Sequence, residues 1–85
     1  MVVFEKCNLL NDYEEVRKRV AELKEGELHY EIPTHDDIKI DNMIRDEVIN
    51  LMTIANKHHI ESRVWENKMN GHFALSFYKH KKNRT

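Results

Sequence analysis

The sequence predicts an α+β fold, a two-layer α/β sandwich in which a mixed sheet is covered on one face by two helices. Two long segments repeat apolar residues every three or four positions, as helices do, and the segments around them alternate apolar and polar residues, as strands do. Asn70 and Gly71 separate two of the alternating segments, which is the strongest short-range signal for a β-hairpin. The expected order is β-α-β-(β)-α-β-β. Because helical connections favour parallel strands and a hairpin is antiparallel, the predicted sheet is mixed.

The N-terminal part of the chain predicts a strand followed by a helix. β-Branched and aromatic residues at positions 2–4 indicate a short first strand. A helix is expected over about residues 13–25, with Asn11 and Asp12 supplying its N-cap. Gly26 is expected to end this helix in a left-handed conformation. The apolar face of the predicted helix consists of Tyr13, Val16, Val20 and Leu23.

The segment after the second strand has two interpretations. Alternation over residues 28–32 predicts that strand, and a proline ends it. Residues 34–41 then form either a short edge strand at 37–40 or a loop that leads into the second helix. In the second case either Thr34 or Asp41 would cap the helix, and Asp41 is favoured.

The second helix is expected over about residues 42–59, and it is more apolar than one sheet face requires. Met43, Ile49 and Ile54 lie off its core stripe. This excess predicts either a wide contact with the first helix or a surface for a partner or a second copy. The core stripe itself consists of Ile44, Val48, Leu51, Met52 and Ala55.

The C-terminal hairpin is expected to join strands at residues 62–69 and 72–80. A two-residue turn at Asn70 and Gly71 would place Met69 opposite His72 and so fix the register. One face of the hairpin would then be core, with Val64, Phe73, Leu75 and Phe77. The opposite face would be solvated, with Arg63, Trp65, Ala74, Ser76 and Tyr78.

Length and composition bound the remaining possibilities. The 85 residues are enough for one domain, expected over residues 1–80, with a basic flexible tail at 81–85. Glu5 and Lys6 interrupt the N-terminal apolar stretch, so no signal peptide is expected, and no apolar run is long enough to span a membrane. The single cysteine, Cys7, is typical of a reducing compartment. A cytoplasmic protein without a membrane partner is therefore predicted.

Motifs that carry enzyme chemistry are missing from the sequence. Both glycines are expected at turns or helix ends, which leaves none for a phosphate-binding loop, and there is no nucleophile elbow. A non-enzymatic protein without a cofactor is therefore predicted. His59, Glu61 and His80 are a weak candidate for a zinc site where the second helix enters the hairpin, although they lack the spacing of known zinc motifs.

The solvated hairpin face is the most informative candidate for a binding surface. Aromatic side chains beside cations are typical of single-strand nucleic-acid binding through stacking and phosphate contacts. The second strand is expected to add two glutamates to this face, which weakens the positive field. The alternative is a protein-interaction module, a regulator or inhibitor, that binds a partner or forms a homodimer through Trp65 or the second helix. The candidate binding residues are Arg63, Trp65, Tyr78, Lys79, Lys81, Lys82 and Arg84.

The predicted element order also resembles that of known nucleic-acid-binding domains. It is similar to the C-terminal domain of bacterial translation initiation factor three, to the Alba chromatin proteins and to small single-strand-binding domains named for an Arg-x-x-x-His signature. That signature is not matched here, because Arg45 is followed four residues later by Ile49. The resemblance therefore implies a fold and carries over no functional residue.

Overall fold

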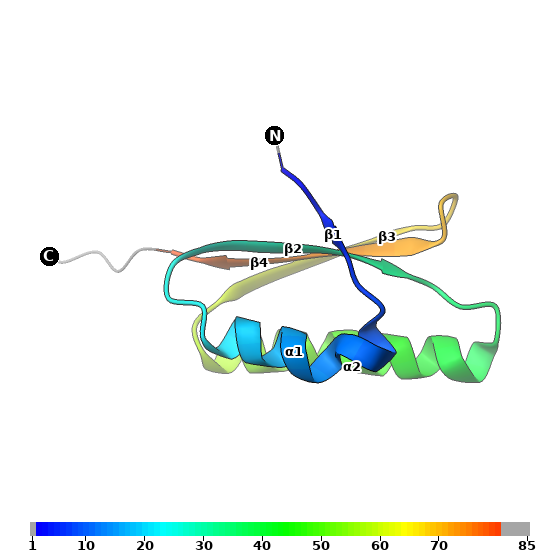
Figure 1. Ribbon diagram of the computed structural model, residues 1–85, viewed down its shortest axis with the longest axis horizontal. Helices are drawn as coiled ribbons and strands as arrows, with labels where there is room; N and C mark the ends of the chain where they lie inside the picture. Colours follow the sequence, from blue (N-terminus) through cyan, green and yellow to red (C-terminus); the bar gives the residue numbers. More distant parts are fainter. Residues whose placement is uncertain (1, 81–85) are drawn as a thin grey trace, which may run out of the picture.

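Four strands and two helices form two layers, with both helices on one face of the sheet (Figure 1). The computed structural model describes residues 2–80. The strand order is β1-β2-β4-β3, with β1 parallel to β2 and the other pairs antiparallel. The mixed sheet and its one-sided helical cover confirm the predicted α+β sandwich. The elements are β1 (Glu5–Lys6), α1 (Leu9–Ala21), β2 (Gly26–Pro33), α2 (Ile38–Lys57), β3 (Glu61–Asn67) and β4 (His72–Lys79).

The first strand lies further along the chain than predicted. Only Glu5 and Lys6 pair with β2, opposite Tyr30 and Glu31. The expected strand at residues 2–4 does not form, and this segment instead rises from the sheet on the face that the helices leave uncovered (Figure 1).

Both helices begin one turn earlier than predicted. The N-cap of α1 is Asn8 rather than Asn11 or Asp12, and α1 ends at Ala21, so Gly26 opens β2 instead of ending the helix. The N-cap of α2 is Asp37, whose side chain accepts a hydrogen bond from the Lys39 amide at 2.9 Å. The expected cap at position 41 and the alternative strand at 37–40 are therefore both wrong.

The hairpin register differs from the prediction by two residues. Asn67, not Met69, pairs with His72, and residues 68–71 form a four-residue loop. The Asn67 side chain accepts hydrogen bonds from the amides of Met69 and Asn70, both at 3.1 Å, so Asn67 organises the turn. A two-residue Asn-Gly turn needs a positive φ at both residues. Gly71 has a φ of 65°, but the φ of Asn70 is not positive, so the expected turn does not form. Because strand side chains alternate with period two, a shift of two residues leaves the predicted faces unchanged.

The core lies between the helices and the sheet. It combines the inner stripes of α1 and α2 with alternate residues of β2 and β4, as the sequence patterns predicted. Val64 of β3, also expected in the core, is instead 43 % exposed, because β3 is the last strand of the sheet. Within residues 2–80, neither helix is long and apolar enough to cross a membrane. The most completely buried large side chains are Tyr30, Phe77, Leu9, Ile32, Leu51, Leu75 and Val20.

Candidate binding surface

The sheet face opposite the helices, here called the open face, is formed by three strands. Because β4 pairs with β2 on one side and with β3 on the other, their outward side chains lie in rows across the sheet. The second strand does contribute two glutamates to this face, as expected, although β4 lies between them and the residues of β3. The open face consists of Glu27, His29 and Glu31 on β2, His72, Ala74, Ser76 and Tyr78 on β4, and Glu61, Arg63, Trp65 and Asn67 on β3.

Trp65 is the most conspicuous feature of this face. Its side chain is 72 % exposed, although tryptophan has one of the largest apolar surfaces of any residue. It stands directly opposite Ala74, whose small side chain leaves a hollow of about 200 Å³ next to the indole. Phe4 reaches this hollow from the segment before β1. We call it the Trp65 hollow, and it is lined by Phe4, Glu31, Trp65, Asn67, His72 and Ala74.

His29 forms a hydrogen-bonded chain at the centre of the open face. Its Nδ1 lies 2.8 Å from the Ser76 hydroxyl, and its Nε2 lies 2.7 Å from a Glu27 carboxylate oxygen. Serine, histidine and glutamate are the residue types of a hydrolytic triad. However, Ser76 is buried and the His29 side chain is only 9 % exposed. The trio therefore orders the centre of the sheet, and it presents no accessible nucleophile.

The one arginine of the open face is paired with a glutamate of the same strand. Arg63 Nε donates to Glu61 at 2.9 Å, and its guanidinium lies 5.5 Å from the centre of the Tyr78 ring. The predicted register would pair Tyr78 with Arg63 and so make it a diagonal neighbour of Trp65, but Tyr78 pairs with Glu61 instead. Within residues 2–80, the open face therefore carries no concentrated positive charge.

Lys79, one of the predicted binding residues, does not lie on the open face. Its ammonium donates to the carbonyl oxygen of His58 at 2.6 Å, where a cation is favourable because α2 ends there. Lys79 thus stabilises a helix end and is engaged on the helical side of the sheet. The other predicted cations, Lys81, Lys82 and Arg84, lie outside the described residues.

The three residues of the weak zinc candidate do not form a metal site. His80 Nε2 lies 3.8 Å from a Glu61 carboxylate oxygen, so two of the three are neighbours. His59 lies in the connection between α2 and β3. Over residues 2–80, no group of three histidine, cysteine, aspartate or glutamate residues is arranged to hold a metal ion.

A second surface lies along the outer side of α2 and β3. Ile49 is 59 % exposed and Val64 is 43 % exposed, and both border a groove of about 240 Å³. Packing against α1 therefore explains only part of the excess apolar surface of the second helix, because Ile49 is exposed and borders a groove with Val64 of β3. The groove is lined by Arg45, Val48, Ile49, Met52, Val64 and Phe73.

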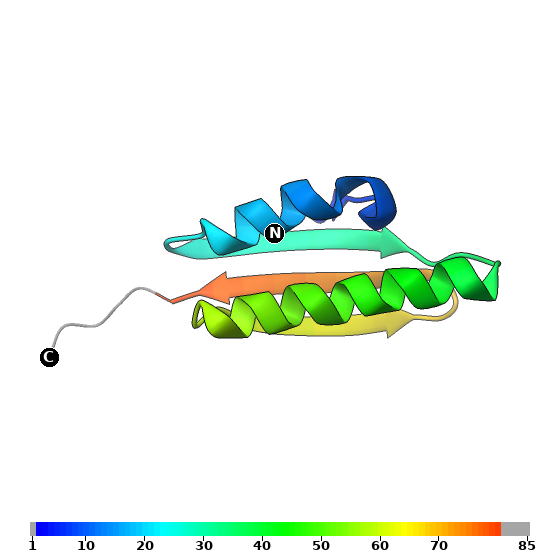
Figure 2. The same ribbon diagram turned by 90° about the horizontal axis from the view of Figure 1, so that it is seen from below.

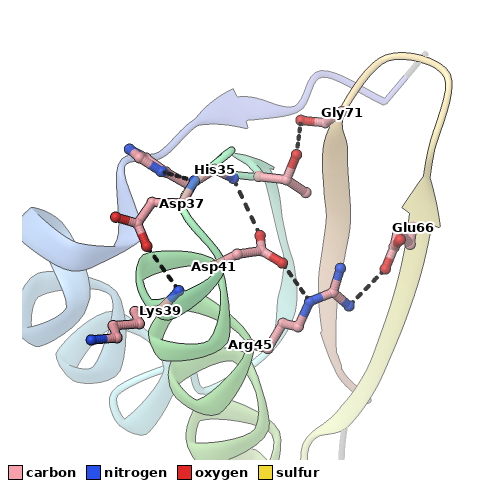
Figure 3. Close-up of polar contacts among 8 residues, drawn as sticks. His35, Asp37, Lys39, Asp41, Arg45, Glu66 and Gly71 are labelled. Atoms are coloured by element: carbon pink, nitrogen blue, oxygen red, sulfur yellow. Dashed lines mark hydrogen bonds and ion pairs between the residues drawn. The ribbon is translucent and has the colours of Figure 1, made fainter.

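Arg45 connects α2 to the hairpin at one end of this groove (Figure 3). It donates to Asp41 and to Glu66, each at 2.8 Å, and its guanidinium lies 4.9 Å from the centre of the Phe73 ring. The Arg45 hydrogen bond holds the pKa of the Asp41 carboxyl below its ordinary range, with help from the hydrogen bond that Asp41 accepts from the His35 amide. This network fixes the β2–α2 loop and β3 relative to α2.

Comparison with protein-family models, curated proteins and solved structures found no match to this chain.

Proposed function

We propose that this protein is a protein-interaction module that binds a partner through the open face, with Trp65 as the central anchor. The observation that carries the proposal is the exposed indole beside the Trp65 hollow. Tryptophan is among the residues that contribute most to protein interfaces, especially where an apolar pocket lies within a polar rim. Here Phe4 and Ala74 supply apolar walls, while Glu31, Asn67 and His72 form the rim.

The dimensions of the hollow indicate what a partner would insert. A volume of about 200 Å³ suits one large apolar side chain, such as leucine, methionine or phenylalanine. The polar rim supplies an acceptor at Glu31 and both donor and acceptor atoms at Asn67. The favoured partner is therefore a protein segment that offers an apolar side chain flanked by polar or basic residues.

The charge distribution favours a protein partner over a single-stranded nucleic acid. Phosphate binding depends on unpaired cations, and single-strand sites combine them with stacked aromatics. On the open face, Arg63 is paired with Glu61, and Glu27 and Glu31 add negative charge. Lys79 contacts the end of α2. Among the residues that the structure describes, the aromatic side chains of the open face therefore have no unpaired cation on the same face.

The test compares the wild-type protein with Trp65→Ala and with a matched control, Met69→Ala. Met69 is also apolar and 96 % exposed, but it lies in the hairpin loop and outside the Trp65 hollow. Each protein is immobilised and exposed to an extract of the cells that express it, and retained proteins are purified for affinity measurements. We expect Trp65→Ala to weaken binding of a partner by about 30-fold or more, as at interface hot spots, and Met69→Ala to have little effect.

A second arm tests nucleic acid directly. Single-stranded DNA and RNA of 20 nucleotides are titrated at low salt while the fluorescence of Trp65, the sole tryptophan of the chain, is followed. We expect no saturable quenching. Binding that weakens with salt and is lost in Trp65→Ala would overturn the proposal in favour of a nucleic-acid module. Partner binding that is equal in Trp65→Ala and in the wild type would also overturn it. Thermal melts of both variants check that the fold is intact.

A further inference from the structure

We infer that β3 is a dimerisation edge, where a second copy of this chain adds its own β3 in antiparallel orientation with Val64 on the twofold axis. The inference goes beyond the proposed function, because it concerns the edge of the sheet and not its open face. In the strand order β1-β2-β4-β3, β3 lies at one end and pairs only with β4 among the described residues. Its outer edge presents backbone N–H and C=O groups that can pair with another strand.

Apolar side chains in the helical layer beside this edge are also left exposed. Figure 2 shows α2 running alongside β3, at the side of the molecule away from α1. Ile49 on α2 and Val64 on β3 border the groove there, and both are exposed to an extent unusual for β-branched apolar residues. A strand added to β3 would bring its own Val64 and its own α2 against these residues. The same contact would therefore continue the sheet and cover the groove.

The sequence of β3 selects one register for such pairing. In an antiparallel pair, residues directly opposite each other lie on the same face, so the axis must pass through a residue position. An axis at Val64 pairs all seven residues of β3, from Glu61 to Asn67, with the partner strand. An axis at Ser62 would place Glu61 opposite Arg63 but would pair only three of the seven residues of β3. An axis at Arg63 or at Glu66 would place like charges opposite each other, and an axis at Trp65 would place Val64 opposite a glutamate.

The Val64 register is self-complementary on both faces. On the open face, Arg63 lies opposite the partner's Trp65, where a guanidinium and an indole can form a cation–π contact. On the helical face, the two Val64 side chains meet each other, and Ser62 lies opposite the partner's Glu66. Such matching of a surface with itself is what a twofold interface requires, and this favours a second copy over an unrelated partner.

The dimer and the Trp65 hollow use different sides of the indole. The hollow lies between Trp65 and Ala74, toward β4, whereas the dimer contact lies on the outer side of β3. Both can therefore exist together. Their tests are also separable, because the dimer is measured on the purified protein alone and needs no partner.

The experiment measures the oligomeric state by sedimentation equilibrium over a range of protein concentrations. We expect a reversible dimer for the wild type. Val64→Glu and Val64→Lys each place two like charges on the axis and should raise the dimer dissociation constant at least 100-fold. A mixture of the two variants should dimerise again, because opposite charges then meet at the axis. Met69→Lys makes the same kind of change in the hairpin loop, beyond the seven residues of β3 that pair in the dimer, and should dimerise like the wild type.

Two results would overturn the inference. The first is a wild-type protein that remains monomeric up to about 1 mM, since an interface of this kind is expected to bind more tightly. The second is a mixture of Val64→Glu and Val64→Lys that dimerises no better than either variant alone. Because Val64 is partly exposed, both variants should fold, and circular dichroism verifies this. Ile49→Lys, on the exposed side of α2, provides a second disruption of the same contact and should also weaken the dimer.

Discussion

Replacing His59 by glycine is expected to stabilise the protein, because His59 holds a left-handed backbone at the end of α2. Its φ is 58°, a conformation in which a Cβ atom crowds the following carbonyl oxygen. The conformation is imposed by the way the helix ends. The Ile60 amide donates to the carbonyl of Ala55 at 2.8 Å, and the His59 amide donates to that of Asn56 at 3.1 Å, the pair of bonds that defines a Schellman motif.

The magnitude follows from two opposing contributions. Removing the Cβ atom relieves about 1–2 kcal/mol of left-handed strain. The glycine also makes the unfolded chain more flexible, which lowers the free energy of unfolding by about 0.4–1 kcal/mol. The imidazole of His59 is exposed, so its loss changes the free energy of unfolding little. The net gain should be about 0.5–1 kcal/mol, which for a domain of this size raises the melting temperature by about 2–8 °C.

The assay is thermal unfolding followed by circular dichroism, with His58→Gly as the matched control. His58 is the preceding residue, is also exposed, and has a φ of −96°, so glycine relieves no strain there. His58→Gly should therefore lower the melting temperature, because only the entropic cost remains. A His59→Gly variant that melts at or below the wild-type temperature, or a His58→Gly variant that gains as much as His59→Gly, would refute the reasoning.

Three further predictions address the hairpin, the thiol and the Arg45 network. Gly71→Val should lower stability by about 1–2 kcal/mol in chemical denaturation, because Gly71 has a φ of 65° and a Cβ there would lie 3.3 Å from the Thr34 hydroxyl oxygen; an unchanged midpoint would contradict this. Burial raises the pKa of the Cys7 thiol to about 11, so iodoacetamide at pH 8 should modify the native protein at least 100-fold more slowly than the denatured one, as followed by mass spectrometry. The folded pKa of Asp41 is lowered, so its contribution to stability is present at neutral pH and is lost as the pH falls through that folded value. Asp41→Asn should therefore flatten the decline in melting temperature between about pH 5 and pH 2, and an identical decline would show that Arg45 does not stabilise the carboxylate.

The sequence predicts that both helices exist but places the start of each one turn too late, and the two errors have the same cause. Asp12 and Asp41 occupy the same position, four residues after the true N-caps Asn8 and Asp37. A carboxylate in the first turn is favoured by the helix dipole, just as a capping side chain is, so composition alone does not separate the two roles. Burial decides the matter, since Leu9 joins the core one turn before the predicted start of α1.

The candidate site could be predicted only where it depends on local alternation. The face of the hairpin that carries Trp65 follows from period two and is unaffected by the error in register. Phe4 enters the hollow because the segment before β1 rises over the open face, which no local pattern indicates. The position of Lys79 likewise depends on a contact with the end of α2, 21 residues earlier in the chain.

The alternation of β3 also connects the two surfaces that we propose. Trp65 points to the open face and Val64 to the helical face, while the backbone between them forms the outer edge of the sheet. Pairing that edge with a second copy around Val64 would extend the sheet to eight strands and place two Trp65 hollows on one continuous face. Two such hollows, related by the twofold axis, would bind a partner that presents two apolar segments far more tightly than a partner that presents one. The strand β3 would thus supply both the Trp65 side chain that binds the partner and the backbone edge that forms the dimer.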